Sequence, residues 1–270
     1  MLIDTHCHLD GFSDDEVMTV VERAESVGVI AIVNAGVTVE SSGRCAELTG
    51  LSMKLLAGVG IHPMDLTQMV DEYVYERLHA IATSTDRVVV ISEIGLDFME
   101  GMPDREMQYQ AFRQQIKLAR ELKKPIVFHS REAHDDVLKV LREERAYEVG
   151  GAMHYFQADL QTAREAIDLG FYISLAKPLL RQLELQEVAA QLPLDHIVLE
   201  TDSAPQPFKR NRDRWTEPRN LKDISEKLAQ LQRRDVEEIQ ATTTANFKRM
   251  LGPSSLVISS LEQAHTQESV

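Results

Sequence analysis

The sequence has few cysteines and no long apolar run. Only two of its 270 residues are cysteine, which excludes a disulfide framework and fits a reducing compartment, so we expect a cytoplasmic protein. No run of about 18 apolar residues occurs, which argues against a membrane-spanning helix. Met1 is not followed by a basic and then apolar leader, so we expect no secretory signal. The sequence also gives no sign of an obligate protein partner.

Basic residues are fewer than acidic residues in this chain. The chain carries 29 Lys and Arg against 43 Asp and Glu, for a formal net charge of −14. Proteins that grip nucleic acid over a broad surface are usually basic, because phosphate contacts dominate that binding. A nucleic acid would therefore have to bind locally, at a site with positive charge of its own. The 43% of hydrophobic residues provides for an ample core.

Short apolar segments alternate with helical patterns along the chain. Ser13 and Glu16 form a capping box before an apolar stripe of helical period, and Gly28 stands where that helix should end. Similar patterns predict helices over residues 104–122 and 159–169. The segments predicted as strands are residues 2–8, 29–33, 54–59, 87–93, 125–129, 151–155, 171–175 and 196–201.

Strands separated by helices pair in parallel through crossover connections. Eight such units predict a single (β/α)8 TIM barrel over residues 1–252, followed by a polar C-terminal tail over residues 253–270 that is loosely ordered at its end. The alternative is an open doubly wound sheet, which usually has a glycine-rich phosphate loop after its first strand. The nearest match, at Gly58 and Gly60, lacks the third glycine and runs into Pro63.

Imidazoles and carboxylates end several of the predicted strands. His6 and His8 are two residues apart on one strand, so they project from the same face. In a parallel barrel the strand ends gather at one mouth, where function is found. The residues expected there are His6, His8, Glu93, His129, His154 and Asp202.

Six ligands are too many for one tetrahedral cation and suit two cations that share a ligand. We expect Glu93 to bridge them, with His6, His8 and Asp202 at one position and His129 and His154 at the other. Imidazole-rich ligation suits Zn, Mn, Ni or Fe better than Mg. The alternatives are hydrogen-bonded surface histidines, a structural ion pair at Glu93 and a helix cap at Asp202.

Such a centre predicts hydrolysis by two-metal activation of water, with Glu93 and Asp202 as the catalytic residues. Asp202 is placed to accept a proton from the water. His62 and Arg131 are candidates for binding substrate, and the alternatives are a cap at His62 and an ion pair at Arg131. A basic cluster near Trp215 is either a strip for single-stranded nucleic acid or a solvated face. It comprises Lys209, Arg210, Arg212 and Arg214.

Seven ordered motifs resemble those of the TatD family of metal-dependent deoxyribonucleases. They are DTHCHLD (4–10), GIHP (60–63), EIGLDF (93–98), PIVFHSREA (125–133), MHYF (153–156), LETDSAP (199–205) and TTANF (243–247). The resemblance implies a (β/α)8 barrel, two metals at the six residues above, and DNA as the substrate. The chain departs from the family pattern after His154, with Tyr155 and Phe156, and after Asp202. Both departures lie where substrate would bind.

Two other functions compete with a deoxyribonuclease. The first is an amide or ester hydrolase that acts on a small molecule with the same metal centre. A closed apolar pocket at Tyr155, Phe156 and the loop 203–215 would favour it, whereas an open groove lined by Arg131 and the basic cluster would favour DNA. The second is a non-catalytic metal-binding protein, and the presence of Asp202 argues against it.

Overall fold

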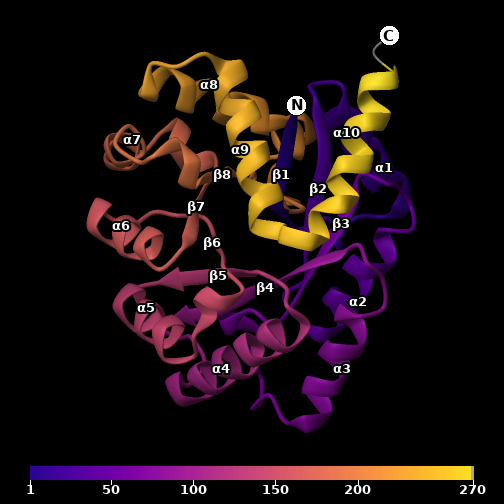
Figure 1. The fold of residues 1–270 in the computed structure, drawn as a ribbon. Coiled ribbons are helices and arrows are strands. Elements are labelled where there is room, and N and C mark those ends of the chain that lie inside the picture. Colours follow the sequence, from indigo (N-terminus) through magenta and orange to yellow (C-terminus); the bar gives the residue numbers. More distant parts are fainter. Residues whose placement is uncertain (269–270) are drawn as a thin grey trace.

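The computed structural model describes residues 1–268, apart from the side chains of Asp213 and of residues 264–268. Within this part, eight parallel strands follow one another in chain order around a nearly closed barrel, with helices outside (Figure 1). The strands are β1 (Leu2–Cys7), β2 (Val29–Ala35), β3 (Leu55–Val59), β4 (Val88–Asp97), β5 (Ile126–Arg131), β6 (Gly151–Met153), β7 (Phe171–Leu175) and β8 (Ile197–Leu199). The predicted TIM barrel is therefore confirmed.

The helices follow the strands as the βα pattern predicts. They are α1 (Asp14–Glu25), α2 (Val39–Leu48), α3 (Glu72–Ala82), α4 (Arg105–Leu122), α5 (His134–Glu143), α6 (Leu160–Asp168), α7 (Leu183–Ala189), α8 (Leu221–Gln232), α9 (Val236–Leu251) and α10 (Leu256–Glu268). The predicted start of α1 is confirmed, because Ser13 and Glu16 cap each other's backbone N–H groups. Gly28 has a φ of 89°, which an L side chain rarely adopts.

The last and first strands meet at the polar end of the barrel. The N–H of Asp202 donates to the carbonyl of His6 at 3.0 Å, and the N–H of His8 donates to that of Ser203 at 2.7 Å. The hydroxyl of Thr5 donates to the carbonyl of Leu199 at 3.0 Å. These bonds join the ends of β1 and β8, so the residues that follow both strands lie side by side.

The segment predicted as a polar tail, residues 253–270, forms a helix from Leu256 to Glu268, and its last two residues, at the end where loose order was expected, lie outside the described part of the chain. Ile258 and Leu261 of α10 are buried and pack with Phe247 of α9 against barrel residues that include Val33 and Val90. The burial of these apolar side chains is what holds the helix in place. The helices α9 and α10 thus cover one end of the barrel (Figure 1), and the polar residues gather at the other.

Candidate metal centre

The six predicted side chains meet at the carboxyl-end mouth of the barrel. Strands β1, β4 and β5 carry His6, Glu93 and His129, while His8, His154 and Asp202 follow the ends of β1, β6 and β8. Every member except Glu93 lies in the last three residues of its strand or up to three residues beyond it. Their convergence therefore follows from the parallel barrel itself.

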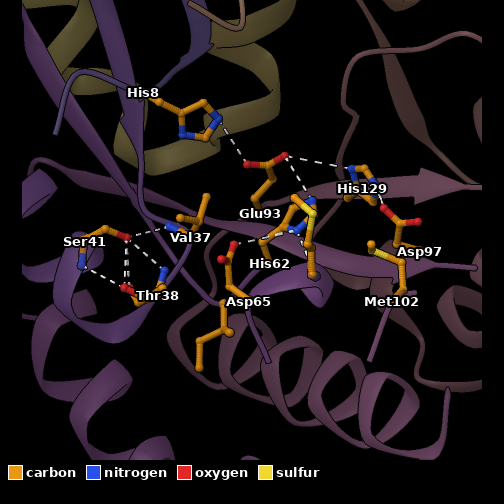
Figure 2. A network of polar contacts seen from close by, with 12 residues as sticks. His8, Val37, Thr38, Ser41, His62, Asp65, Glu93, Asp97, Met102 and His129 are labelled. Carbon is orange, nitrogen blue, oxygen red and sulfur yellow. Dashed lines mark hydrogen bonds and ion pairs between the residues drawn. The ribbon is translucent and has the colours of Figure 1, made fainter. Parts of the chain in front are cut away.

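Glu93 lies at the centre of this cluster. Its Oε2 is 3.4 Å from Nε2 of His6 and 3.2 Å from Nε2 of His8. Its Oε1 is 3.2 Å from Nε2 of His154 and 3.9 Å from Nδ1 of His129. In Figure 2, His8 lies on one side of the Glu93 carboxylate and His129 on the other. The two oxygens thus face separate pairs of imidazoles.

The sequence analysis placed the end of the fourth strand at Glu93, which is wrong. Strand β4 continues to Asp97, and Ile94 and Leu96 are fully buried. The strand passes through Gly95, which is needed for close packing of the two neighbouring strands. A Cβ atom there would lie 2.0 Å from the carbonyl oxygen of His129 on β5, so only glycine allows the two strands to approach this closely.

Asp202 completes one side of the cluster. Its Oδ1 is 3.3 Å from Nε2 of His8 and 3.9 Å from Nε2 of His154. Its side chain is 25% exposed, against 6% for Glu93, so Asp202 is the carboxylate that solvent can reach. Asp202 has a φ of 50°, an uncommon backbone conformation for a residue with a side chain, of the kind that clusters at functional sites.

Three of the four imidazoles have an oxygen atom within 3.0 Å of the nitrogen that faces away from Glu93, and for His8 and His129 this contact is a hydrogen bond. The far nitrogen of His8, Nδ1, lies 2.9 Å from the carbonyl oxygen of Ala35. Nδ1 of His154 lies 3.0 Å from Oε1 of Glu200, and Nε2 of His129 lies 3.0 Å from Oδ2 of Asp97. When the nitrogen that faces away from Glu93 carries the ring proton, the nitrogen that faces Glu93 keeps a free lone pair. This is the usual state of a metal-ligating histidine.

Asp97 and Glu200 were not found by the sequence analysis. Asp97 was hidden by the misplaced end of β4, and Glu200 stands only two residues before Asp202. Both are fully buried, which carboxylates almost never are unless they have partners. A buried acid beside a candidate ligand is the signal that would have identified them, but burial is known only from the fold.

The electrostatics of the cluster fit a cation. Although burial opposes ionisation of Glu93, the imidazoles of His154, His6 and His8 hold the pKa of its carboxyl well below the usual range. Nδ1 of His6 is buried without a hydrogen-bond partner. Three sets of donor atoms each lie within 4.8 Å of one another, namely His6, His8 and Glu93; His6, His154 and Asp202; and His62, Glu93 and His129. A divalent cation requires several nitrogen and oxygen ligand atoms that converge on one position, as these buried atoms do.

His62 serves as a cap and also faces the cluster. Its Nδ1 accepts a hydrogen bond of 3.0 Å from the N–H of Met64, at the start of the short helix η1 (Pro63–Asp65). Burial lowers the pKa of His62 to about 4, so the ring is neutral near pH 7 and its proton lies on Nε2. That nitrogen is 3.7 Å from Oε1 of Glu93 (Figure 2). His62 therefore presents a hydrogen-bond donor to the site rather than a lone pair.

The ion pair considered for Arg131 is present. Its Nε and a terminal nitrogen lie 2.8 Å and 2.6 Å from Oδ2 of Asp97. Burial opposes ionisation of Asp97, but its hydrogen bonds with His129 and Arg131 hold its pKa well below the usual value. Arg131 thus orients the carboxylate that lies behind His129, and part of its guanidinium charge is neutralised there.

The predicted basic cluster divides into two parts. Arg212 lies 2.7 Å from the buried carboxylate of Glu217, and its guanidinium stacks 4.3 Å from the ring centre of Trp215. The indole N–H of Trp215 donates to the carbonyl of Lys209 at 3.0 Å. Arg212 and Trp215 therefore hold the loop together and are not available for nucleic acid, whereas the side chains of Arg210 and Arg214 are exposed.

Comparisons with known proteins identify one family. The profile of the family described as TatD related DNase matches residues 3–252. The uncharacterized metal-dependent hydrolase YabD of Bacillus subtilis is 35% identical over 93% of this chain and 98% of its own length. The putative deoxyribonuclease TATDN3 of Mus musculus is 31% identical over 98% of this chain and 92% of its own length.

A solved structure supports the same assignment. The crystal structure of YJJV, a TatD homologue from Escherichia coli, superposes with a TM-score of 0.83 at 30% identity, covering 93% of this chain and 97% of that chain. None of the described helices is long and apolar enough to cross a bilayer. On the strength of the family match along nearly its whole length, the chain belongs to the TatD family of metal-dependent hydrolases.

Proposed function

We propose that the chain is a deoxyribonuclease that hydrolyses phosphodiester bonds of DNA with two divalent cations. The observation that carries the proposal is the position of Glu93, whose two carboxylate oxygens face separate pairs of imidazoles. An ion pair with a purely structural role would need an imidazole at only one of the two carboxylate oxygens of Glu93. Glu93 is therefore proposed as the bridging ligand, with the remaining five residues divided between the two positions.

The proposed ligands of the first cation are His6, His8, Glu93 and Asp202, and those of the second are Glu93, His129 and His154. With four imidazoles in the set, Zn, Mn, Ni or Fe suits the donors better than Mg. Two bound cations would supply Lewis-acid polarisation of a phosphoryl oxygen and would lower the pKa of water. Glu200 and Asp97 fix the ring orientations of His154 and His129 through the contacts described above.

The chain's own residues supply the proton transfers. Asp202 is the carboxylate that is both within the cluster and open to solvent, so it is proposed to accept the proton of the attacking water and to return one to the leaving oxygen. The Nε2–H of His62 faces the same space and is proposed to donate a hydrogen bond to a phosphoryl oxygen. Arg131 acts mainly through Asp97.

The surroundings favour a polyanion over a small neutral substrate. Phe156 is buried and does not line the mouth. Tyr155 and Asp202 instead line an open depression of about 360 Å³ whose other walls include Lys177, Arg181 and Lys209. An open cationic surface of this kind supports DNA as the substrate, and it is formed by Lys177, Arg181 and Lys209 without the predicted Arg131. Both cysteines are free and buried, which supports the expected cytoplasmic location.

The test is cleavage of end-labelled single-stranded and duplex DNA with and without a chelator. We expect cleavage that is lost with the chelator and restored by a divalent cation. Asp202→Asn should lower turnover by about 10²- to 10⁴-fold, the usual contribution of a general base, and should retain most of the metal when metal content is measured. Undiminished cleavage by Asp202→Asn would refute its role. Absence of DNA cleavage with every cation tried would instead favour the amide or ester hydrolase.

A further inference from the structure

A surface depression leads outward from Asp202. The depression that Asp202 and Tyr155 line shares three residues, Lys177, Arg181 and Lys209, with a neighbouring one of about 480 Å³. Arg210 and Arg214 line the second depression. We call the five cations Lys177, Arg181, Lys209, Arg210 and Arg214 the basic trough. It is formed by the segments that follow β7 and β8, and it begins at the metal centre.

In the described part of the chain, the cations of the basic trough have no carboxylate partner. Lys177 donates to the hydroxyl of Thr216 at 2.6 Å, and Lys209 donates to the side-chain carbonyl of Gln206 at 2.6 Å. Among the residues that the structure describes, no carboxylate forms an ion pair with Arg181, Arg210 or Arg214. By contrast, several cations on the outer helices are paired, as Arg120 is with Glu148 at 2.6 Å.

These unpaired charges lie close to one another. Burial lowers the pKa of Lys177, and the nearby charges of Lys209 and Arg181 lower it further, with Asp223 acting in the opposite sense. In a chain with a net charge of −14, carboxylates to neutralise them are abundant. Cations that repel one another without such partners are arranged for an anion that is not part of the chain.

The loop that carries the trough is held in place from behind. Glu217, which is 2% exposed, accepts two hydrogen bonds of 2.8 and 2.7 Å from Arg23 of α1. Arg212 and Arg219 lie 2.7 and 3.2 Å from the same carboxylate. Because Arg212 is turned toward Glu217, the trough is organised before any ligand arrives, which reduces the entropy cost of binding.

The opposite flank of the metal centre differs in charge. The depression beside His62, of about 350 Å³, is lined by Glu40, Asp65 and Arg77. Its one cation, Arg77, lies 3.2 Å from Glu40. A strand that crosses the mouth would therefore meet unpaired cations on the β7–β8 side and a net acidic surface on the β2–β3 side.

We propose that the basic trough binds the phosphates of a single DNA strand on one side of the bond that is cleaved. The inference rests on the proposed deoxyribonuclease function and adds a subsite to it. Successive phosphates follow the cations outward from Asp202, and Tyr155 at the start of the trough offers a ring for a base to stack on, as aromatic side chains do in single-strand grooves.

The first test measures binding. In an Asp202→Asn background, which slows turnover, the triple change Arg181→Gln, Arg210→Gln and Arg214→Gln should weaken binding of a fluorescent single-stranded oligonucleotide. Each lost phosphate contact reduces the slope of log affinity against log salt concentration by about 0.7. At 0.1 M salt this weakens binding about fivefold for each contact, and so roughly 10²-fold for three contacts. The matched control, called the helix control, is Lys123→Gln, Arg164→Gln and Arg233→Gln, three exposed cations that lie in a helix or directly after one and outside the trough. Equal loss in the two variants would overturn the proposal.

The second test measures cleavage with otherwise wild-type Asp202. The trough variant should lose roughly 10²-fold in kcat/KM on the oligonucleotide and stay within about twofold on bis(4-nitrophenyl) phosphate, which has no flanking phosphates. Equal losses on both substrates would show that the variant damages the centre and would overturn the proposal. If the wild-type protein cleaves neither substrate, the proposed function itself fails, and that outcome is distinct from a failure of the trough.

The third test locates the contacts on the strand. Neutral methylphosphonate linkages placed one at a time should slow cleavage when they lie on one side of the cleaved bond and have little effect on the other. The trough variant should lose this sensitivity, whereas the helix control should keep it. Equal sensitivity on both sides, or sensitivity that survives in the trough variant, would contradict the one-sided arrangement.

Discussion

Glu200 offers a test of whether the buried carboxylates behind the imidazoles control metal affinity. It is fully buried, and its Oε1 lies 3.0 Å from Nδ1 of His154 and accepts a 2.6 Å bond from the N–H of Tyr155. Its Oε2 accepts a 2.6 Å bond from the hydroxyl of Ser174. In Glu200→Gln the amide oxygen can take the first position and the amide NH2 can donate to Ser174. The change therefore removes the charge and keeps the geometry.

Loss of an outer partner of a metal-ligating histidine typically costs 10- to 100-fold in metal affinity. Because the glutamine still accepts from His154, we expect the lower end for Glu200→Gln, about tenfold or about 1.4 kcal/mol. Glu200→Leu removes the acceptor altogether and leaves the N–H of Tyr155 unpaired, so the upper end, about 100-fold, is expected there.

The assay is calorimetric or chelator-competition titration of the metal-free protein with Zn²⁺ or Mn²⁺. If two cations bind, the affinity for the cation held by His129 and His154 should fall, whereas the affinity for the other cation should change little. Glu187→Gln on the exposed surface of α7 is the control and should match the wild type. Metal affinity within twofold of the wild type in both Glu200 variants would refute the assignment of Glu200 as the residue that positions His154.

Two further predictions concern stability. Ile258→Ala should lower the free energy of unfolding by about 2–5 kcal/mol in urea titrations, because it removes a fully buried side chain of α10, whereas Leu256→Ala, at a side chain 74% exposed, should stay within about 0.5 kcal/mol. A small effect at Ile258 would mean that α10 does not hold the barrel end. The metal-free protein should also lose stability as pH falls from about 6.5 to about 4, since His62 has a pKa of about 4 when folded and 6.5 when unfolded. The unfolded chain takes up a proton that the native state does not, which costs up to about 3 kcal/mol. His62→Gln should reduce that slope, and an unchanged slope would contradict it.

The barrel and the convergence of the six side chains could be predicted because both depend on local patterns. Apolar runs with turn signals locate strands, and in a parallel barrel the strand ends share one mouth. The end of β4 was missed because a glycine inside a strand weakens the strand pattern of the sequence. Only the approach of β5 reveals that Gly95 instead makes room for the backbone at His129.

Contacts between residues far apart in the chain could not be predicted. Arg23 and Glu217 are 194 residues apart. Nothing in the local sequence distinguishes Arg212, which pairs with Glu217, from Arg210, for which no carboxylate partner is found among the described side chains. The same holds for α10. Its few apolar residues are visible in the sequence, but only the fold shows that they pack against the end of the barrel. Pairing and burial are decided by the fold, and they separate the cations that hold the loop from those that face solvent.

The acidic character of the chain and its proposed anionic substrate are compatible because charge is distributed unevenly. Outer-helix cations such as Arg113 and Arg120 are paired with carboxylates of neighbouring helices, so they contribute little field beyond the surface. The cations of the basic trough have no such partners among the described residues, and they lie beside a mouth with low-dielectric walls. A polyanion is therefore repelled by most of the surface and attracted along the basic trough. This raises the local concentration of the polyanion at the metal centre. On this reasoning, lower ionic strength should raise kcat/KM for an oligonucleotide more than for an isolated phosphodiester, since only the former spans the trough.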